Sequence, residues 1–154
     1  MGNMEQYIEE GLPEVVAWVE AQERMILEQG EPLCDQGLQD AKAMGVEHPE
    51  RIRLLEVDDV PLPDHPLMRE AAAAGLLVAR PSAMCVRYGL FIRRNCPNKR
   101  YVIAHECVHT SQFERLGGIE AFSRQYLIEC FTQGYMDSPL EAEAMRKTEG
   151  LMQE

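Results

Sequence analysis

Hydrophobic residues recur along most of this chain at the spacing of amphipathic helices. In the first segment they return every three or four positions, which predicts a helix over residues 4–29 with Gly30 as its C-terminal stop. Pro13 can occupy a first helical turn, so it marks a possible break within that helix. The N-terminal part, residues 1–50, is therefore expected to be helical. Further helices are predicted over residues 33–44, 68–77, 99–116 and 119–134, and from Ser138 onward.

Two stretches carry the pattern of β-strands. Apolar side chains alternate with other residues over 82–94, which predicts one long or hairpinned strand. A short apolar run at 54–57 predicts a second strand, followed by a proline-rich loop. The expected fold class is α+β: a mainly helical single domain over residues 1–154, with a small antiparallel sheet packed against the helix at 99–116.

Composition and charge narrow the class of protein. A chain of 154 residues with 45% hydrophobic content fits one globular domain with its own core. The net charge of -11 disfavours a nucleic-acid partner, because phosphate binding relies on clustered Lys and Arg. No apolar run approaches the length of a membrane span, and no basic-then-apolar signal segment opens the sequence. We therefore expect no membrane partner and a cytoplasmic location.

The strongest chemical motif is the run His105-Glu106-Cys107-Val108-His109, which has the HExxH form. Residues four apart on a helix share a face, so His105 and His109 can direct ring nitrogens at one metal ion. Glu106 lies about 100° further round the helix, which suits a carboxylate that takes a proton from the attacking water. Cys107 points about 200° from His105 and is expected to pack behind the site.

The five cysteines are odd in number and form no CxxC pair. Neither a disulfide framework nor a structural zinc knuckle is indicated. We expect the cysteines to be reduced and buried.

A third metal ligand must come from outside the motif, since catalytic zinc sites usually take three protein ligands. Metzincins place Gly and His at the third and sixth positions after the second histidine, but Gln112 and Arg115 stand there. His48 and His65 precede the motif in loop-like stretches without motif context. The carboxylates within residues 138–144 are the better candidates.

The stretch from about residue 87 to 146 resembles the gluzincin type of zinc metallopeptidase, especially its small uncharacterised bacterial members. The shared features are a strand, the HExxH helix, a Gly-Gly break, a second helix and a third helix carrying Glu-x-x-Ala. The resemblance implies that His105, His109 and Glu141 bind Zn²⁺ and that Glu106 is the general base. It also assigns residues 82–152 to a core of one strand and three helices around the metal.

Glu141 has an alternative explanation, because Ser138-x-x-Glu141 fits a capping box in which the glutamate bonds the cap's backbone N–H. A glutamate cannot easily do that and bind zinc. Glu143 lies about 200° further round the helix, so at most one of the two faces the site. Glu141 is favoured, because the small Ala144 one turn later would let this helix approach the motif helix. Met145 stands where the family often has an Asp that holds a ligand histidine.

The implied activity is hydrolysis of peptide or amide bonds, with Glu106 accepting the proton. A donor for the developing oxyanion is usually needed, and the candidates are Tyr135, Tyr126 and Arg146. Tyr135 is preferred because it lies in the loop before the third helix. The resemblance further suggests a peptide or protein substrate paired along the strand at 82–94.

The alternative function is a non-catalytic zinc-binding or interaction domain derived from a metallopeptidase. Structural zinc sites tend to be closed by a fourth protein ligand, whereas catalytic sites keep one position open. The number of protein donors at the site therefore distinguishes the two hypotheses. The sequence leaves the substrate and the oligomeric state undetermined.

Overall fold

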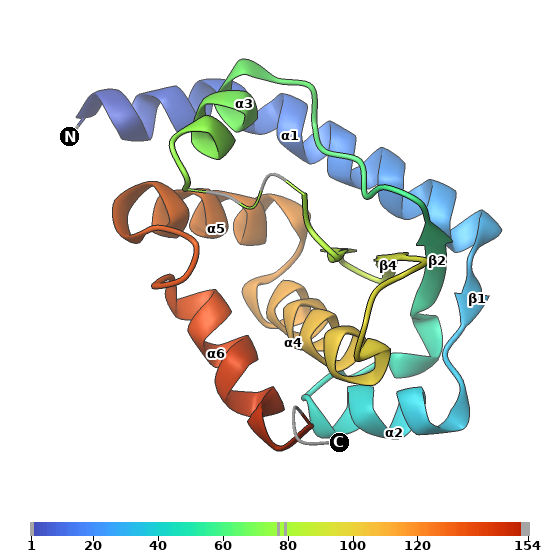
Figure 1. Ribbon diagram of the computed structural model, residues 1–154. Coiled ribbons are helices and arrows are strands. Elements are labelled where there is room, and N and C mark those ends of the chain that lie inside the picture. Colours follow the sequence, from blue (N-terminus) through green and yellow to red (C-terminus); the bar gives the residue numbers. More distant parts are fainter. Residues whose placement is uncertain (1, 77, 79, 152–154) are drawn as a thin grey trace.

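The computed structural model describes residues 2–76, 78 and 80–151 (Figure 1). Two ends of predicted segments lie outside the described residues. They are Leu77, the last residue of the helix predicted over 68–77, and residue 152, the last of the core predicted over 82–152. The elements in chain order are α1 (Gly2–Gln29), β1 (Glu31–Pro32), α2 (Asp35–Ala43), a 3₁₀ turn (Pro49–Arg51), β2 (Arg53–Val57), α3 (Pro66–Ala73), β3 (Ala83–Val86), β4 (Gly89–Arg93), α4 (Lys99–Leu116), α5 (Ile119–Gln133), α6 (Pro139–Thr148) and a final 3₁₀ turn (Glu149–Leu151).

The predicted fold class is confirmed: the domain is mainly helical with one small sheet. The sheet is mixed, however, and the prediction of a purely antiparallel sheet is wrong. Its strand order is β1-β2-β4-β3, with β2 and β4 parallel and the other two pairs antiparallel. After β2, the segment carrying α3 takes the chain to the opposite edge of the sheet, where β3 forms. The hairpin that follows β3 then places β4 between β3 and β2. Apolar alternation reports burial and contains no information about the direction of the neighbouring strand.

The predicted strand at 82–94 is a hairpin that turns at Arg87 and Tyr88. Arg87 has a φ of 68°, the left-handed conformation that tight hairpin turns require. Glu23 of α1 holds this turn, accepting two 2.8 Å hydrogen bonds from the Arg87 guanidinium and one of 3.1 Å from the Tyr88 backbone N–H. The first helix therefore fixes the hairpin whose outer strand borders the candidate site.

The sheet lies between α1 on one face and α4 on the other (Figure 1). Its central strand β4 is buried on both faces. Leu90 belongs to a cluster with Cys107 of α4, and Phe91 belongs to a larger cluster with Ile26 of α1. Cys107 thus packs behind the motif face, as expected. α1 continues through Pro13, so the break considered at that residue does not occur.

One expectation about the cysteines is wrong. All five are free, but Cys34 is exposed, and its sulfur accepts a 3.4 Å hydrogen bond from the Gly37 backbone N–H as the N-cap of α2. None of the helices in the described part of the chain is long and apolar enough to cross a membrane.

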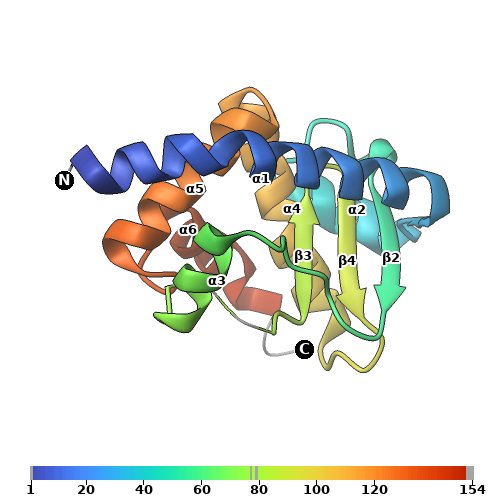
Figure 2. The ribbon, with the colours of Figure 1, turned by 90° about the horizontal axis from the view of Figure 1, so that it is seen from above.

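The Gly117-Gly118 pair ends α4 and reverses the chain. Both glycines have positive φ, 102° and 132°, a conformation that side chains with a Cβ disfavour. α5 then packs against α1, and α6 packs against α4 (Figures 1 and 2). This return places the first turn of α6 beside the middle of α4, where the motif lies.

Candidate metal centre

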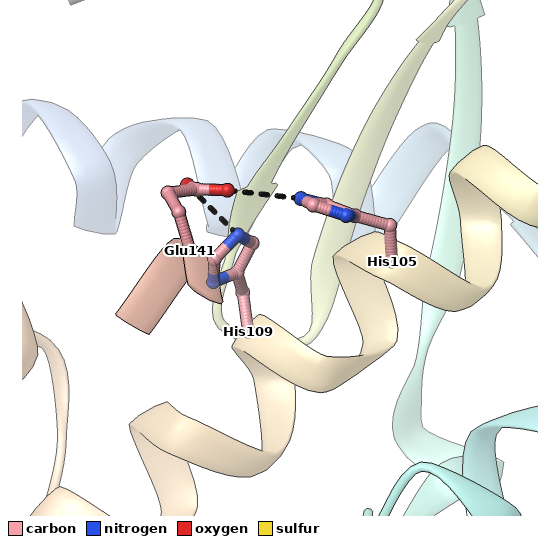
Figure 3. Close-up of side chains that lie close together, drawn as sticks. All are labelled: His105, His109 and Glu141. Carbon is pink, nitrogen blue, oxygen red and sulfur yellow. Dashed lines mark hydrogen bonds and ion pairs between the residues drawn. The ribbon is translucent and has the colours of Figure 1, made fainter. Parts of the chain in front are cut away.

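Three buried side chains from two helices converge between α4 and α6 (Figure 3). His105 and His109 project from successive turns of α4, and Glu141 projects from the first turn of α6. His105 Nε2 lies 3.0 Å from Glu141 Oε1, and His109 Nε2 lies 3.1 Å from Glu141 Oε2. The exposed fractions are 8% for His105, 5% for His109 and 2% for Glu141. The donor atoms all lie within 4.8 Å of one another, close enough to share one metal ion.

The start of α6 explains how Glu141 reaches the histidines. The Ser138 hydroxyl accepts a 3.3 Å hydrogen bond from the Glu141 backbone N–H, and Pro139 begins the helix. This is one half of the capping box considered from the sequence. The Glu141 carboxylate does not return to the cap but points at His105 and His109 (Figure 3). The cap and the site therefore use different parts of the same residue.

Glu143, the competing candidate, is directed elsewhere. Its carboxylate accepts a 2.7 Å hydrogen bond from Gln112 Nε2 and one of 2.9 Å from Arg115. Lys147, one helical turn later, is an additional ion-pair partner at 3.4 Å. Glu141, and not Glu143, is the carboxylate that lies with the two histidines.

Gln112 also belongs to the site, although no sequence motif indicated a role for it there. Its Oε1 lies 2.8 Å from His109 Nδ1 and accepts the ring N–H, which leaves His109 Nε2 directed at Glu141. Its Nε2 donates to the Leu140 carbonyl at 2.9 Å and to Glu143. Gln112 thus orients one histidine and ties α4 to α6, the kind of support expected from an Asp at position 145. Its place one turn after His109 was the only available sequence indication.

We expect Gln112→Ala to weaken zinc binding about 10- to 100-fold, because His109 loses the partner that fixes its ring. Titration against a chromophoric chelator measures this affinity, and circular dichroism checks that the variant is folded. Gln133→Ala, at the exposed end of α5, is the matched control and should bind zinc like the wild type. Equal affinities in both variants would remove Gln112 from the site.

The three candidate oxyanion donors have different surroundings. The Tyr126 hydroxyl donates a 2.7 Å hydrogen bond to Glu141 Oε2, so it holds the carboxylate in place. Tyr135, in the turn before α6, lines the cavity at the site. Burial, followed by the charges of Glu141 and Glu106, raises the pKa of Tyr135, which keeps its hydroxyl protonated as a donor. Arg146 is exposed and lies outside the cavity wall.

Burial and charge act on the ionisable groups in opposite directions. Burial raises the pKa of Glu106, and the charges of His109 and His105 partly offset that effect. For His109, burial lowers the pKa, but the hydrogen bond and charge of Glu141 prevail and raise it to about 9. For Glu141, burial opposes ionisation, yet hydrogen bonds from His105 and His109 hold its pKa well below the usual range. Glu141 is therefore ionised, as a metal ligand must be.

The remaining histidines do not join this cluster. His48 lies 3.9 Å from Glu50 at the surface. His65 caps α3, accepting a 3.0 Å hydrogen bond from the Leu67 backbone N–H, and lies 3.2 Å from Glu14. Within residues 2–76, 78 and 80–151, the cluster contains three protein donors and no fourth.

Comparison of the chain with protein-family models, with curated proteins and with solved structures found no match. The resemblance to gluzincins consequently rests on the motif and on the residues that follow it, and it stays a prediction.

Proposed function

We propose that this protein is a zinc-dependent peptidase of the gluzincin type. The observation that carries the proposal is the convergence of both HExxH histidines with a glutamate from a separate downstream helix, next to a cavity. Two imidazoles and one carboxylate form a donor set that zinc accepts in hydrolases. The separations between each histidine Nε2 and the nearer Glu141 oxygen, 3.0 and 3.1 Å, are close to the roughly 3.3 Å between neighbouring ligands of tetrahedral zinc.

Each residue has a distinct role in the proposed reaction. His105, His109 and Glu141 would hold the zinc ion, which when bound supplies a Lewis acid for water activation and carbonyl polarisation. Glu106 borders the cavity from the same helix and would accept the proton of the attacking water. Tyr135 borders the cavity from the turn before α6 and would donate a hydrogen bond to the oxygen of the scissile carbonyl.

The free edge of β3 supports a peptide as the substrate. β4 is paired on both sides, so within the predicted stretch 82–94 only β3 can accept a further strand among the described residues. The Arg93 N–H bonds to the Ser82 carbonyl, and the alternation of the ladder then directs the peptide groups of Ala83 and Cys85 away from β4. An extended substrate would pair with these groups beside the metal donors.

The competing function is a zinc-binding domain without hydrolytic activity. A closed site with four protein ligands would favour it, whereas the described residues supply three donors and an adjoining cavity. The number of donors therefore favours the hydrolase.

The proposal is tested first by the zinc-to-protein ratio of tag-free protein, measured by inductively coupled plasma mass spectrometry. We expect a ratio near one that collapses in His105→Ala, followed by cleavage within a peptide library. A ratio near zero after zinc addition and gentle dialysis would refute a metal site. A loaded protein that cleaves no peptide would favour the non-catalytic alternative.

A further inference from the structure

The metal donors lie at one side of a cavity of about 500 Å³, which is large enough for more than the reacting groups. The rest of its wall is mostly apolar and comes from elements distant in sequence, α1, β3 and α5. The apolar lining residues from these elements include Val15, Trp18, Val19, Met84, Phe122 and Leu127. A ligand side chain placed here would exchange water for hydrocarbon contacts.

The mouth of the cavity is also apolar. Four large hydrophobic side chains are exposed among the described residues: Leu27, Leu62, Val78 and Met136. Three of them, Leu62, Val78 and Met136, border this cavity, from the loops on either side of α3 and from the turn before α6. Met136 is 65% exposed. Exposed apolar residues gathered around one cavity mark a binding surface, whereas scattered ones need no explanation.

Charged groups are scarce in the wall away from the metal donors. Among the described lining residues, Arg80 is the one further charged side chain outside the group formed by His105, Glu106, His109 and Glu141. It is 72% exposed and pairs with Asp59 at 2.9 Å. Away from these four residues the wall therefore offers no buried counter-charge, and a charged ligand side chain placed there would lose its hydration without compensation.

The free edge of β3 favours a polypeptide as the ligand over another apolar amide, such as an acylated lipid. Ala83 and Cys85, whose peptide groups face away from β4, belong to the same wall. In Figure 2 the helices α3, α5 and α6 lie on the side of β3 away from β4, and all three contribute residues to the cavity wall. Outward-facing peptide groups recognise another extended backbone, whereas an acyl chain has no groups to pair with them.

We propose that the cavity binds an extended, uncharged polypeptide segment and selects a large aliphatic or aromatic side chain beside the scissile bond. This inference rests on the proposed peptidase function and names its substrate class. Replacing that side chain with alanine should weaken binding about 10- to 100-fold, the discrimination that an apolar pocket provides for a leucine-sized group.

Trp18, the chain's single tryptophan, reports on occupancy because it lies in the cavity wall. The experiment uses zinc-loaded Glu106→Gln protein, so that binding is followed by fluorescence without turnover. The probes are blocked pentapeptides, alanine except for Leu, Phe, Ala, Asp or Lys at the centre. We expect the Leu and Phe peptides to change Trp18 emission and to bind 10- to 100-fold more tightly than the Ala peptide. The Asp and Lys peptides should bind no better than the Ala peptide.

A pair of surface variants localises the binding. Leu62→Ser, at the mouth, should reduce affinity for the Leu peptide at least threefold. Leu27→Ser removes a similarly exposed leucine outside the wall and should leave the affinity unchanged. Equal binding of all five peptides, or tighter binding of an N-acyl amide than of the Leu peptide, would overturn the inference. Selective binding by a protein that never cleaves would refute only the peptidase function, and unselective cleavage would refute only the substrate class.

Discussion

Glu141→Ala is expected to abolish tight zinc binding, whereas Glu143→Ala should leave the protein loaded. Glu141 is 2% exposed and lies about 3 Å from both histidine Nε2 atoms, at 3.0 and 3.1 Å. If three ligands share a zinc-binding free energy of about 12 kcal/mol, losing one costs roughly 4 kcal/mol, or about 1000-fold in affinity. Chelator competition measures the affinity, and mass spectrometry measures the bound metal.

Glu143→Ala is the matched control because it removes the same side chain two residues away on the same helix. The substitution removes one hydrogen-bond partner of Gln112. Gln112 keeps its contacts with His109 and Leu140. The loss should therefore stay below about tenfold, less than for removing Gln112 itself. Zinc lost from Glu143→Ala and kept in Glu141→Ala would reassign the third ligand.

Glu106→Gln should lower turnover of a cleavable peptide about 100- to 10,000-fold while the zinc content stays near that of the wild type. Glutamine has the shape of glutamate but cannot accept a proton at neutral pH. Glu106 borders the cavity without belonging to the three-donor group, so its replacement should leave the three proposed ligands in place. Single-turnover kinetics and metal analysis on the same preparation separate the two effects.

Glu120→Gln, an exposed substitution in the first turn of α5, controls for the loss of one negative charge and should not change turnover. Retained activity in Glu106→Gln would show that another group takes the proton. Loss of zinc together with activity would mean that Glu106 acts on the metal site and not on the water.

The sequence predicted the helices around the site well because their information is local. The helix expected at 99–116 is observed as Lys99–Leu116, and the one expected from 119 is Ile119–Gln133. Glycines with positive φ at 117 and 118 fix the boundary between them. The parallel pairing of β2 with β4 was not predictable in this way. It depends on the path of the α3 segment around the sheet, and apolar alternation is the same for either direction.

At the site, the motif predicted which face of α4 matters but not what supports it. Glu141 was favoured over Glu143 from a small residue one turn later, and the structure places Glu141 with the histidines. The conflict with the capping box disappeared because Ser138 uses the backbone of Glu141 and not its carboxylate. Gln112 was missed because its partners, Leu140 and Glu143, lie on another helix, and sequence spacing does not reveal contacts between helices.

The position of Glu141 would link binding of the proposed metal to folding. Glu141 lies on α6, 36 residues after His105 of α4. The complete set of three donors therefore exists only when α6 is packed against α4. A ligand that binds the folded state alone stabilises it, by about 2.7 kcal/mol when free zinc is 100 times the dissociation constant. The metal would thus act as a clamp between two helices, and undocking of α6 would be the step that releases it.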